Sequence, residues 1–177
     1  MIKRNYFILT GAMGGGKSTI LARLAELGVY CVPEPARAIL AEQRLLESSG
    51  VPEKKAESFT MLMLARAIHN YQEKQPLSDS IIFDRGIPDM IAYANLSGLD
   101  PTSYINAGQA FRYNTTVFYF AAWQAIYTND EERKISFEGA QAFGIDVKAI
   151  YESLGYRILE VPRLSIEERA KFILERI

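Results

Sequence analysis

The sequence predicts an α/β fold in which helices cover both faces of a parallel β-sheet. Three observations support this prediction. Short apolar runs of strand length alternate along the chain with longer segments of helical period. The runs are apolar throughout, which is typical of strands buried on both faces. A glycine-rich segment follows the first run and leads directly into an amphipathic helix, as in sheets that bind ligands at the carboxyl ends of their strands.

The first half of the chain is punctuated by glycine and proline. Gly28 ends the first helical segment, Pro35 stands where a helix begins favourably, and Pro76 ends a long helical segment. The elements expected here are, in order, a strand at residues 6–9, a helix at 18–27, a strand at 29–32, helices at 36–48 and 53–74, and a strand at 81–83.

The second half continues the alternation. Ser165 and Glu168 form a capping-box pattern at the start of the last helix, and Gly139 and Gly144 weaken the helix before it. The elements expected here are helices at 88–96 and about 101–112, a strand at 116–120, a polar stretch at 123–134, a helix at about 137–154, a strand at 156–161 and the helix from Ser165.

Composition narrows the class of protein. The 177 residues fit a single domain spanning 1–177, and the net charge of −1 gives no sign of a nucleic-acid or membrane partner. Cys31 is the only cysteine, which excludes an intramolecular disulfide and a thiolate metal cluster, and His69 is the only histidine, which argues against histidine metal sites and histidine triads. We find no signal peptide or membrane span, and expect a cytoplasmic protein.

The glycine-rich segment is a complete phosphate-binding loop (P-loop). Its glycines let backbone N–H groups approach an anion, and the following helix adds its positive N-terminal end. Lys17 is expected to contact the β- and γ-phosphates of ATP, and the Ser18 hydroxyl to contact Mg²⁺. The nucleotide-binding residues expected are Gly11, Ala12, Met13, Gly14, Gly15, Gly16, Lys17, Ser18 and Thr19.

The third strand ends in Asp84, which is followed by Arg85. A carboxylate at this position holds the magnesium shell in P-loop proteins, so Ser18 and Asp84 are the predicted metal residues. The alternative for Asp84 is a helix N-cap, and for Arg85 a surface ion pair. A cation beside the γ-phosphate suits phosphoryl transfer better than activation of water. The guanine-specificity motif Asn-Lys-x-Asp is absent, and the chain is too short for a ring-forming ATPase.

Two prolines flank Glu34 at the end of the second strand. They stiffen the backbone and fix a carboxylate at the active edge of the sheet, where it can accept a proton from an acceptor hydroxyl. The alternative is that Glu34 only complements a helix dipole. Glu34, Arg37, Arg85 and Asp89 are the predicted acceptor contacts.

These motifs together resemble a known group. Over almost the whole length, the chain is similar to the small AAA-type domain family related to the ribosylnicotinamide kinase domain of the bacterial NAD-salvage regulator. It also resembles deoxynucleoside and thymidylate kinases around Glu34 and Asp84. The segments that carry the resemblance are the P-loop, Pro33-Glu34-x-Ala36-Arg37, residues 84–89, residues 127–134, Gly155-Tyr156 and Pro162.

The resemblance implies roles for individual residues. Glu34 would be the base, Asp84 a magnesium-shell carboxylate, and Arg85 an acceptor or phosphate clamp. Arg133 would be an arginine of a lid at about 123–134, its alternative being a solvated helix charge. The compact Arg133-Lys134 pair differs from the spaced lid arginines of nucleoside-monophosphate kinases, which leaves the charge of the acceptor open.

The sequence therefore predicts a P-loop three-layer sandwich with strand order 2-3-1-4-5. The predicted activity is ATP- and Mg²⁺-dependent phosphoryl transfer to a small hydroxyl-bearing acceptor, catalysed by Lys17, Glu34, Asp84, Arg85 and Arg133. Two alternatives stay open: a nucleotide-dependent regulatory ATPase or switch with a protein partner, and a nucleotide-binding scaffold without catalysis. The sequence fixes neither the acceptor nor the oligomeric state.

Overall fold

The computed structural model describes residues 2–73, 79–128 and 135–177. Its strands form one parallel sheet in the order β2-β3-β1-β4-β5, which confirms the predicted fold class and strand order. The strands are β1 (Tyr6–Gly11), β2 (Tyr30–Val32), β3 (Ile81–Asp84), β4 (Thr116–Phe120) and β5 (Arg157–Glu160).

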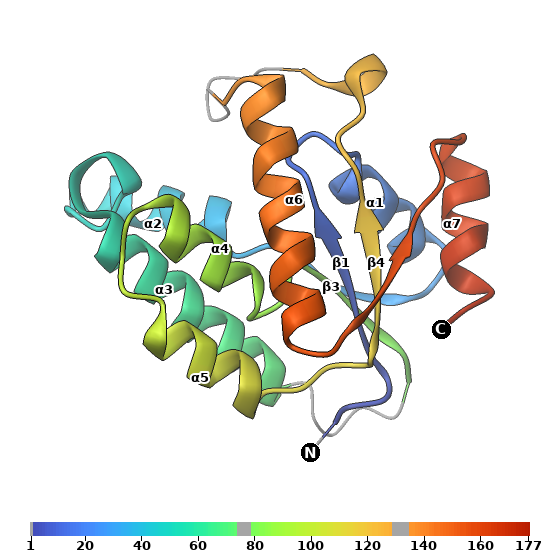
Figure 1. The fold of residues 1–177 in the computed structure, drawn as a ribbon, viewed down its shortest axis with the longest axis horizontal. Helices are drawn as coiled ribbons and strands as arrows, with labels where there is room; N and C mark the ends of the chain where they lie inside the picture. Colours follow the sequence, from blue (N-terminus) through green and yellow to red (C-terminus); the bar gives the residue numbers. More distant parts are fainter. Residues whose placement is uncertain (1, 74–78, 129–134) are drawn as a thin grey trace.

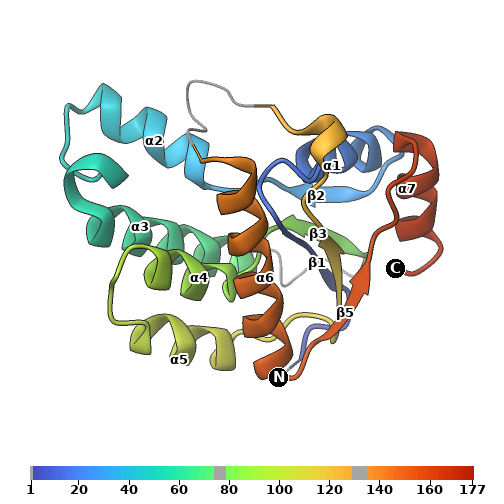
Figure 2. The same ribbon diagram turned by 45° about the horizontal axis from the view of Figure 1, so that its top comes forward.

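Helices cover both faces of this sheet (Figures 1 and 2). They are α1 (Lys17–Glu26), α2 (Ala36–Leu45), α3 (Pro52–Glu73), α4 (Asp89–Leu96), α5 (Thr102–Ala110), α6 (Phe137–Ser153) and α7 (Ile166–Leu174), with a short 3₁₀ turn η1 (Gln124–Ile126) after β4. Figure 1 shows α6 crossing in front of the sheet, with α3, α4 and α5 to one side and α7 on the other.

The central strand β1 explains why the strands are apolar throughout. Tyr6 and Ile8 lie in the core that the sheet forms with α2 to α6, whereas Phe7 and Leu9 lie in the core formed with α1 and α7. All four side chains are buried. Because successive side chains of a strand point to opposite faces, burial of both faces requires a continuous apolar run.

Several boundaries differ from the predicted ones for identifiable reasons. β1 continues to Gly11, beyond the predicted end at residue 9, because Gly11 still pairs with Phe120 of β4. α6 is continuous despite its glycines. Gly144 lets it approach the P-loop, since a Cβ there would come within 2.9 Å of the Ala12 Cβ. In α3, Lys55 departs from helical geometry and kinks the first turn.

All the strands run in the same direction, so the segments that follow them open at one edge of the sheet. The P-loop, Glu34 and Arg85 follow β1, β2 and β3 respectively, and Trp123 follows β4. Across the described ranges, no helix has both the length and the apolar character needed to cross a membrane.

Candidate active site

The P-loop joins β1 to α1 in the geometry that anion binding requires. Gly11, Gly14 and Gly16 have φ values of 117°, 74° and 85°, a left-handed region that residues with a side chain rarely adopt. The Ala12 N–H donates to the Phe120 carbonyl at 2.9 Å, which ties the loop to β4. No side chain in the described part of the chain caps α1. Its first N–H groups are therefore suited to phosphate oxygens.

Lys17 lies folded against this loop. Its Nζ donates to the Ala12 carbonyl at 2.6 Å and approaches the Gly11 carbonyl at 3.5 Å, and the residue is only 6% exposed. Burial, and after it the charge of Arg85, lowers the pKa of Lys17 to about 7. A desolvated cation held by neutral carbonyl groups is placed to gain strongly from a phosphate anion.

Ser18 and Asp84 meet although they are far apart in the sequence. The Ser18 hydroxyl donates to Asp84 Oδ2 at 3.3 Å, while the buried Asp84 Oδ1 has no hydrogen-bond partner among the residues that the structure describes. Burial raises the pKa of Asp84, and the neighbouring Lys17 charge opposes this. The described residues contain no cluster of three acidic, histidine or cysteine ligands. One hydroxyl and one carboxylate nevertheless fit Mg²⁺, which takes its remaining ligands from phosphates and water.

Glu34 stands in an ion pair with Arg85. The Arg85 Nε lies 2.9 Å from Glu34 Oε1, without hydrogen-bond alignment, and the Tyr93 hydroxyl donates to the same oxygen at 3.0 Å. The Glu34 side chain is 26% exposed, whereas that of Arg85 is 3% exposed. Both contacts engage one carboxylate oxygen, and they hold the side chain in a fixed orientation.

Asp89 lies behind Arg85 and not in the wall of the cavity. Its Oδ1 accepts from Arg85 Nη1 at 2.9 Å and from the Thr10 hydroxyl at 2.6 Å. Its Oδ2 accepts from the Gly86 N–H at 2.9 Å and the Tyr151 hydroxyl at 2.6 Å. Arg85 itself has a φ of 67°, and its Nη1 also donates to the Gly11 carbonyl at 3.2 Å. The predicted contact between Asp89 and an acceptor stays a prediction, and the structure adds that Asp89 anchors Arg85.

A cavity of about 900 Å³ connects these groups. One side, which we call the donor side because the phosphate donor ATP is expected there, is lined by the P-loop from Met13 to Thr19 except Gly15. Side chains that follow β4 and β5, among them Trp123 and Arg169, also line it. Its other side, the acceptor side, is lined by Glu34, Ala36, Arg37, Leu40, Pro52, Phe59, Arg85, Tyr93 and Leu96. Of the predicted residues that follow separate strands, most of the P-loop, Glu34, Arg37 and Arg85 line this one cavity, whereas Asp84 and Asp89 do not.

Sequence reasoning missed two residues of this cavity. Tyr93 lies on α4 and reaches Glu34, and Arg169 lies on α7 and donates to the Gly15 carbonyl at 2.7 Å. Neither belongs to a recognisable motif. The usable signal was their position on helices that follow the third and fifth strands. Arg133 lies outside the described residues, so its predicted role stays a prediction.

Comparison with known proteins agrees with the fold. A family model described as an AAA domain matches residues 6–169. No curated protein matches the sequence at a significant level. Among solved structures, the chain is similar to deoxyadenosine kinase from M. mycoides with the products dCMP and dCDP. The two structures share a TM-score of 0.70 and 18% identity over 97% of each chain.

Two further structures are similar. The first is the NadR protein in complex with NR, with a TM-score of 0.66 and 15% identity over 97% of this chain and 49% of that one. The second is thymidylate kinase from Ehrlichia chaffeensis, with a TM-score of 0.63 and 18% identity over 98% of this chain and 97% of that one. At these identities the likeness shows a shared fold, and it confirms the resemblance found in the sequence.

Proposed function

The chain belongs to the AAA domain family, and we propose that it is a phosphotransferase that uses ATP and Mg²⁺ to phosphorylate a hydroxyl group of a small acceptor. One observation carries the proposal: the partly exposed Glu34 carboxylate lines the same cavity as the P-loop and is held there by Arg85 and Tyr93. A fixed carboxylate near the γ-phosphate position can orient and deprotonate an acceptor hydroxyl.

Each group of residues has a separate proposed role, which follows from its position in the site. The P-loop N–H groups and Lys17 would hold the phosphates of ATP. Ser18 and Asp84 would hold Mg²⁺, which would neutralise phosphate charge. Glu34 receives the proton of the attacking hydroxyl. Arg85 fixes the Glu34 carboxylate through the ion pair between them.

The acceptor side of the cavity favours a flat molecule with apolar surface. Phe59 and Tyr93 provide aromatic surface, and Leu40 and Leu96 provide apolar surface. Arg85 is already paired with Glu34 and Asp89, so its charge is neutralised within the protein. Arg37 also lines this side, so the walls suit either a nucleoside or a nucleotide, whose phosphate a cation can bind.

The test is phosphoryl transfer by a Glu34→Gln variant. Nucleosides, nucleotides and nicotinamide riboside are first screened for acceptor-dependent ADP release by the wild type. With the best acceptor, Glu34→Gln is expected to lower transfer by about 10²–10⁴-fold, because the amide cannot accept the proton. Background ATP hydrolysis and ATP affinity are expected to change far less.

Two outcomes would contradict the proposal. Equal losses of transfer and hydrolysis would remove Glu34 from acceptor chemistry. ADP release that no acceptor stimulates but a protein partner raises would favour the regulatory ATPase. Tyr93→Phe is the matched control, because it removes one hydrogen bond from Glu34 and keeps the carboxylate. We expect it to retain most of the transfer activity.

A further inference from the structure

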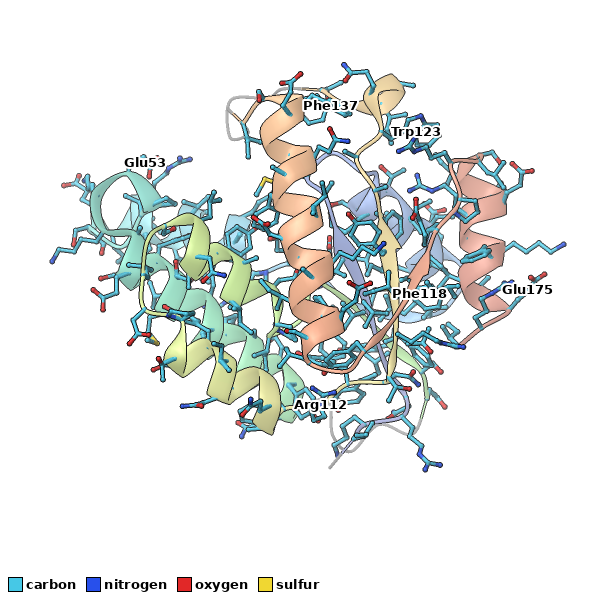
Figure 3. All side chains as sticks on the ribbon, in the orientation of Figure 1. Glu53, Arg112, Phe118, Trp123, Phe137 and Glu175 are labelled. Carbon is cyan, nitrogen blue, oxygen red and sulfur yellow. The ribbon has the colours of Figure 1, made fainter. Side chains whose placement is uncertain are left out.

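Arg169 reaches the P-loop from the opposite end of the chain. It lies on α7, where its Nη2 donates to the Gly15 carbonyl at 2.7 Å. Its Nη1 lies against Gly16, where a Cβ would come within 2.8 Å of it. The guanidinium carbon is 4.9 Å from the ring centre of Phe120 and 5.5 Å from that of Trp123. Figure 3 shows Trp123 on the segment after β4, toward the start of α7.

Among the described residues, this guanidinium is buried without an acidic partner. Arg169 is 4% exposed, yet within residues 2–73, 79–128 and 135–177 no carboxylate lies within ion-pair distance of it. Burial lowers its pKa. Buried charges are normally paired, because removing an ion from water is strongly unfavourable. The two aromatic faces offset only part of that cost, since a cation–π contact is weak compared with the loss of hydration.

The donor groups of Arg169 are also incompletely used. In the part of the chain that the structure describes, the buried Nε has no hydrogen-bond partner, and the guanidinium donates to a P-loop carbonyl. The side chain lines the donor side of the cavity beside Gly16 and Trp123. An anion that occupies the P-loop would supply both the missing charge and the missing acceptor.

We propose that Arg169 is a phosphate-binding residue of the donor site, which donates to the polyphosphate chain of the bound nucleoside triphosphate while holding Gly15 in place. The ligand class is a nucleoside di- or triphosphate, or inorganic polyphosphate. The inference requires a nucleotide in the P-loop but no acceptor. It therefore stands or falls separately from the transfer reaction proposed above.

Binding of ATP and of inorganic tripolyphosphate, without acceptor, tests the assignment. Trp123 is the only tryptophan of the chain and adjoins Arg169, so its fluorescence is one readout, with calorimetry as the second. Arg169→Met is expected to weaken both ligands about 10- to 150-fold, the equivalent of one hydrogen bond to a charged group. Arg169→Lys keeps the charge but loses the planar fork, and is expected to fall between Arg169→Met and the wild type.

Arg163→Met is the matched control. Arg163 also donates to a backbone carbonyl, that of Ala122 at 2.8 Å, but it does not line the cavity. We expect this variant to bind both ligands as the wild type does. If Arg169→Met fails to fold, the affinities of Arg169→Lys for ATP and for tripolyphosphate provide the test of the proposal.

Two results would overturn the proposal. Unchanged affinity for both ligands, with only a lower melting temperature, would make Arg169 a structural residue. Weakened binding of ATP with undiminished binding of tripolyphosphate would move its contact to the base or the ribose.

Discussion

Two buried arginines face the same cavity and differ in how their charge is balanced. Arg85, on the acceptor side, is paired with Glu34 and with the fully buried Asp89. Arg169, on the donor side, contacts a carbonyl group and two aromatic faces, and no carboxylate of the described residues pairs with it. Lys17 resembles Arg169, because its hydrogen bonds also go to carbonyl oxygens.

The comparison distinguishes a buried cation that is balanced by carboxylates of the protein from buried cations that a bound anion would balance. A buried cation with an internal counter-ion is balanced in the free protein, and removing its partner leaves an uncompensated buried charge. A desolvated cation without one costs stability until an anion binds. Acceptor-side variants should therefore affect the free protein, and donor-side variants should affect mainly the complex.

The largest effect is expected for Asp89→Asn in the free protein. The substitution removes one of the two carboxylates that balance Arg85 and disturbs four hydrogen bonds. The free energy of unfolding, measured with urea, should fall by about 3–5 kcal/mol. Tyr151→Phe removes only one of those hydrogen bonds and should cost about 1 kcal/mol. Equal and small losses for both variants would show that Asp89 does not balance the charge of Arg85.

Asp84→Asn should affect turnover with Mg²⁺. The amide is nearly the same shape as the carboxylate but cannot neutralise a divalent ion. Mg²⁺-dependent turnover is expected to fall by at least about 10²-fold, while nucleotide affinity without the metal is largely kept. The exposed Asp100 offers a control, since Asp100→Asn should leave turnover unchanged. Undiminished turnover by the Asp84 variant would remove that residue from the metal site.

Lys17→Met should separate the free protein from the complex. In the wild type, ATP at about 100 times its dissociation constant should add about 2.7 kcal/mol of stability, a rise in melting temperature of roughly 5–11 °C. The variant should lose most of this rise. Its melting temperature without nucleotide should be no lower than that of the wild type, because a desolvated charge is removed. A variant that ATP stabilises as strongly as the wild type would contradict the P-loop assignment.

The smallest expected effect is the uptake of part of a proton by Lys17 when ATP binds. The pKa of Lys17 is lowered to about 7 in the free protein from 10.5, so at pH 8 most of these side chains are neutral. Phosphate binding favours the charged form and raises the pKa, so ATP binding at pH 8 should take up a proton. At pH 6 Lys17 is already charged and contributes no uptake. Calorimetry at pH 8 in two buffers of different ionisation enthalpy measures this, and Lys17→Met should abolish it.

The same shift gives the free protein a pH dependence of stability. Between pH 7 and 10.5 the unfolded chain keeps the Lys17 proton that the folded chain has lost. This residue's contribution to stability therefore rises with pH across that window. Below pH 7 both states are protonated and the contribution is constant. A loss of the rise in Lys17→Met would assign it to this side chain.

The sequence by itself determined the phosphate site and the sheet. The P-loop is contiguous, and its glycines, Lys17 and Ser18 act through local backbone geometry, so their pattern is readable without the fold. The strand runs and their helices likewise follow from local periodicity. Glu34 and Asp84 could be placed at one edge of the sheet because each follows a parallel strand.

Only the tertiary structure decided how the charges are balanced. Arg169 is 154 residues from Gly15 along the chain, and Tyr93 is 59 residues from Glu34. No local pattern reports such contacts. Even the contact between Asp89 and Arg85, which are close in the sequence, is only partly predictable from the sequence. Its spacing of four from Arg85 indicates that the two lie close together. Which side of Arg85 it occupies depends on the packing of Thr10 and Tyr151 from β1 and α6.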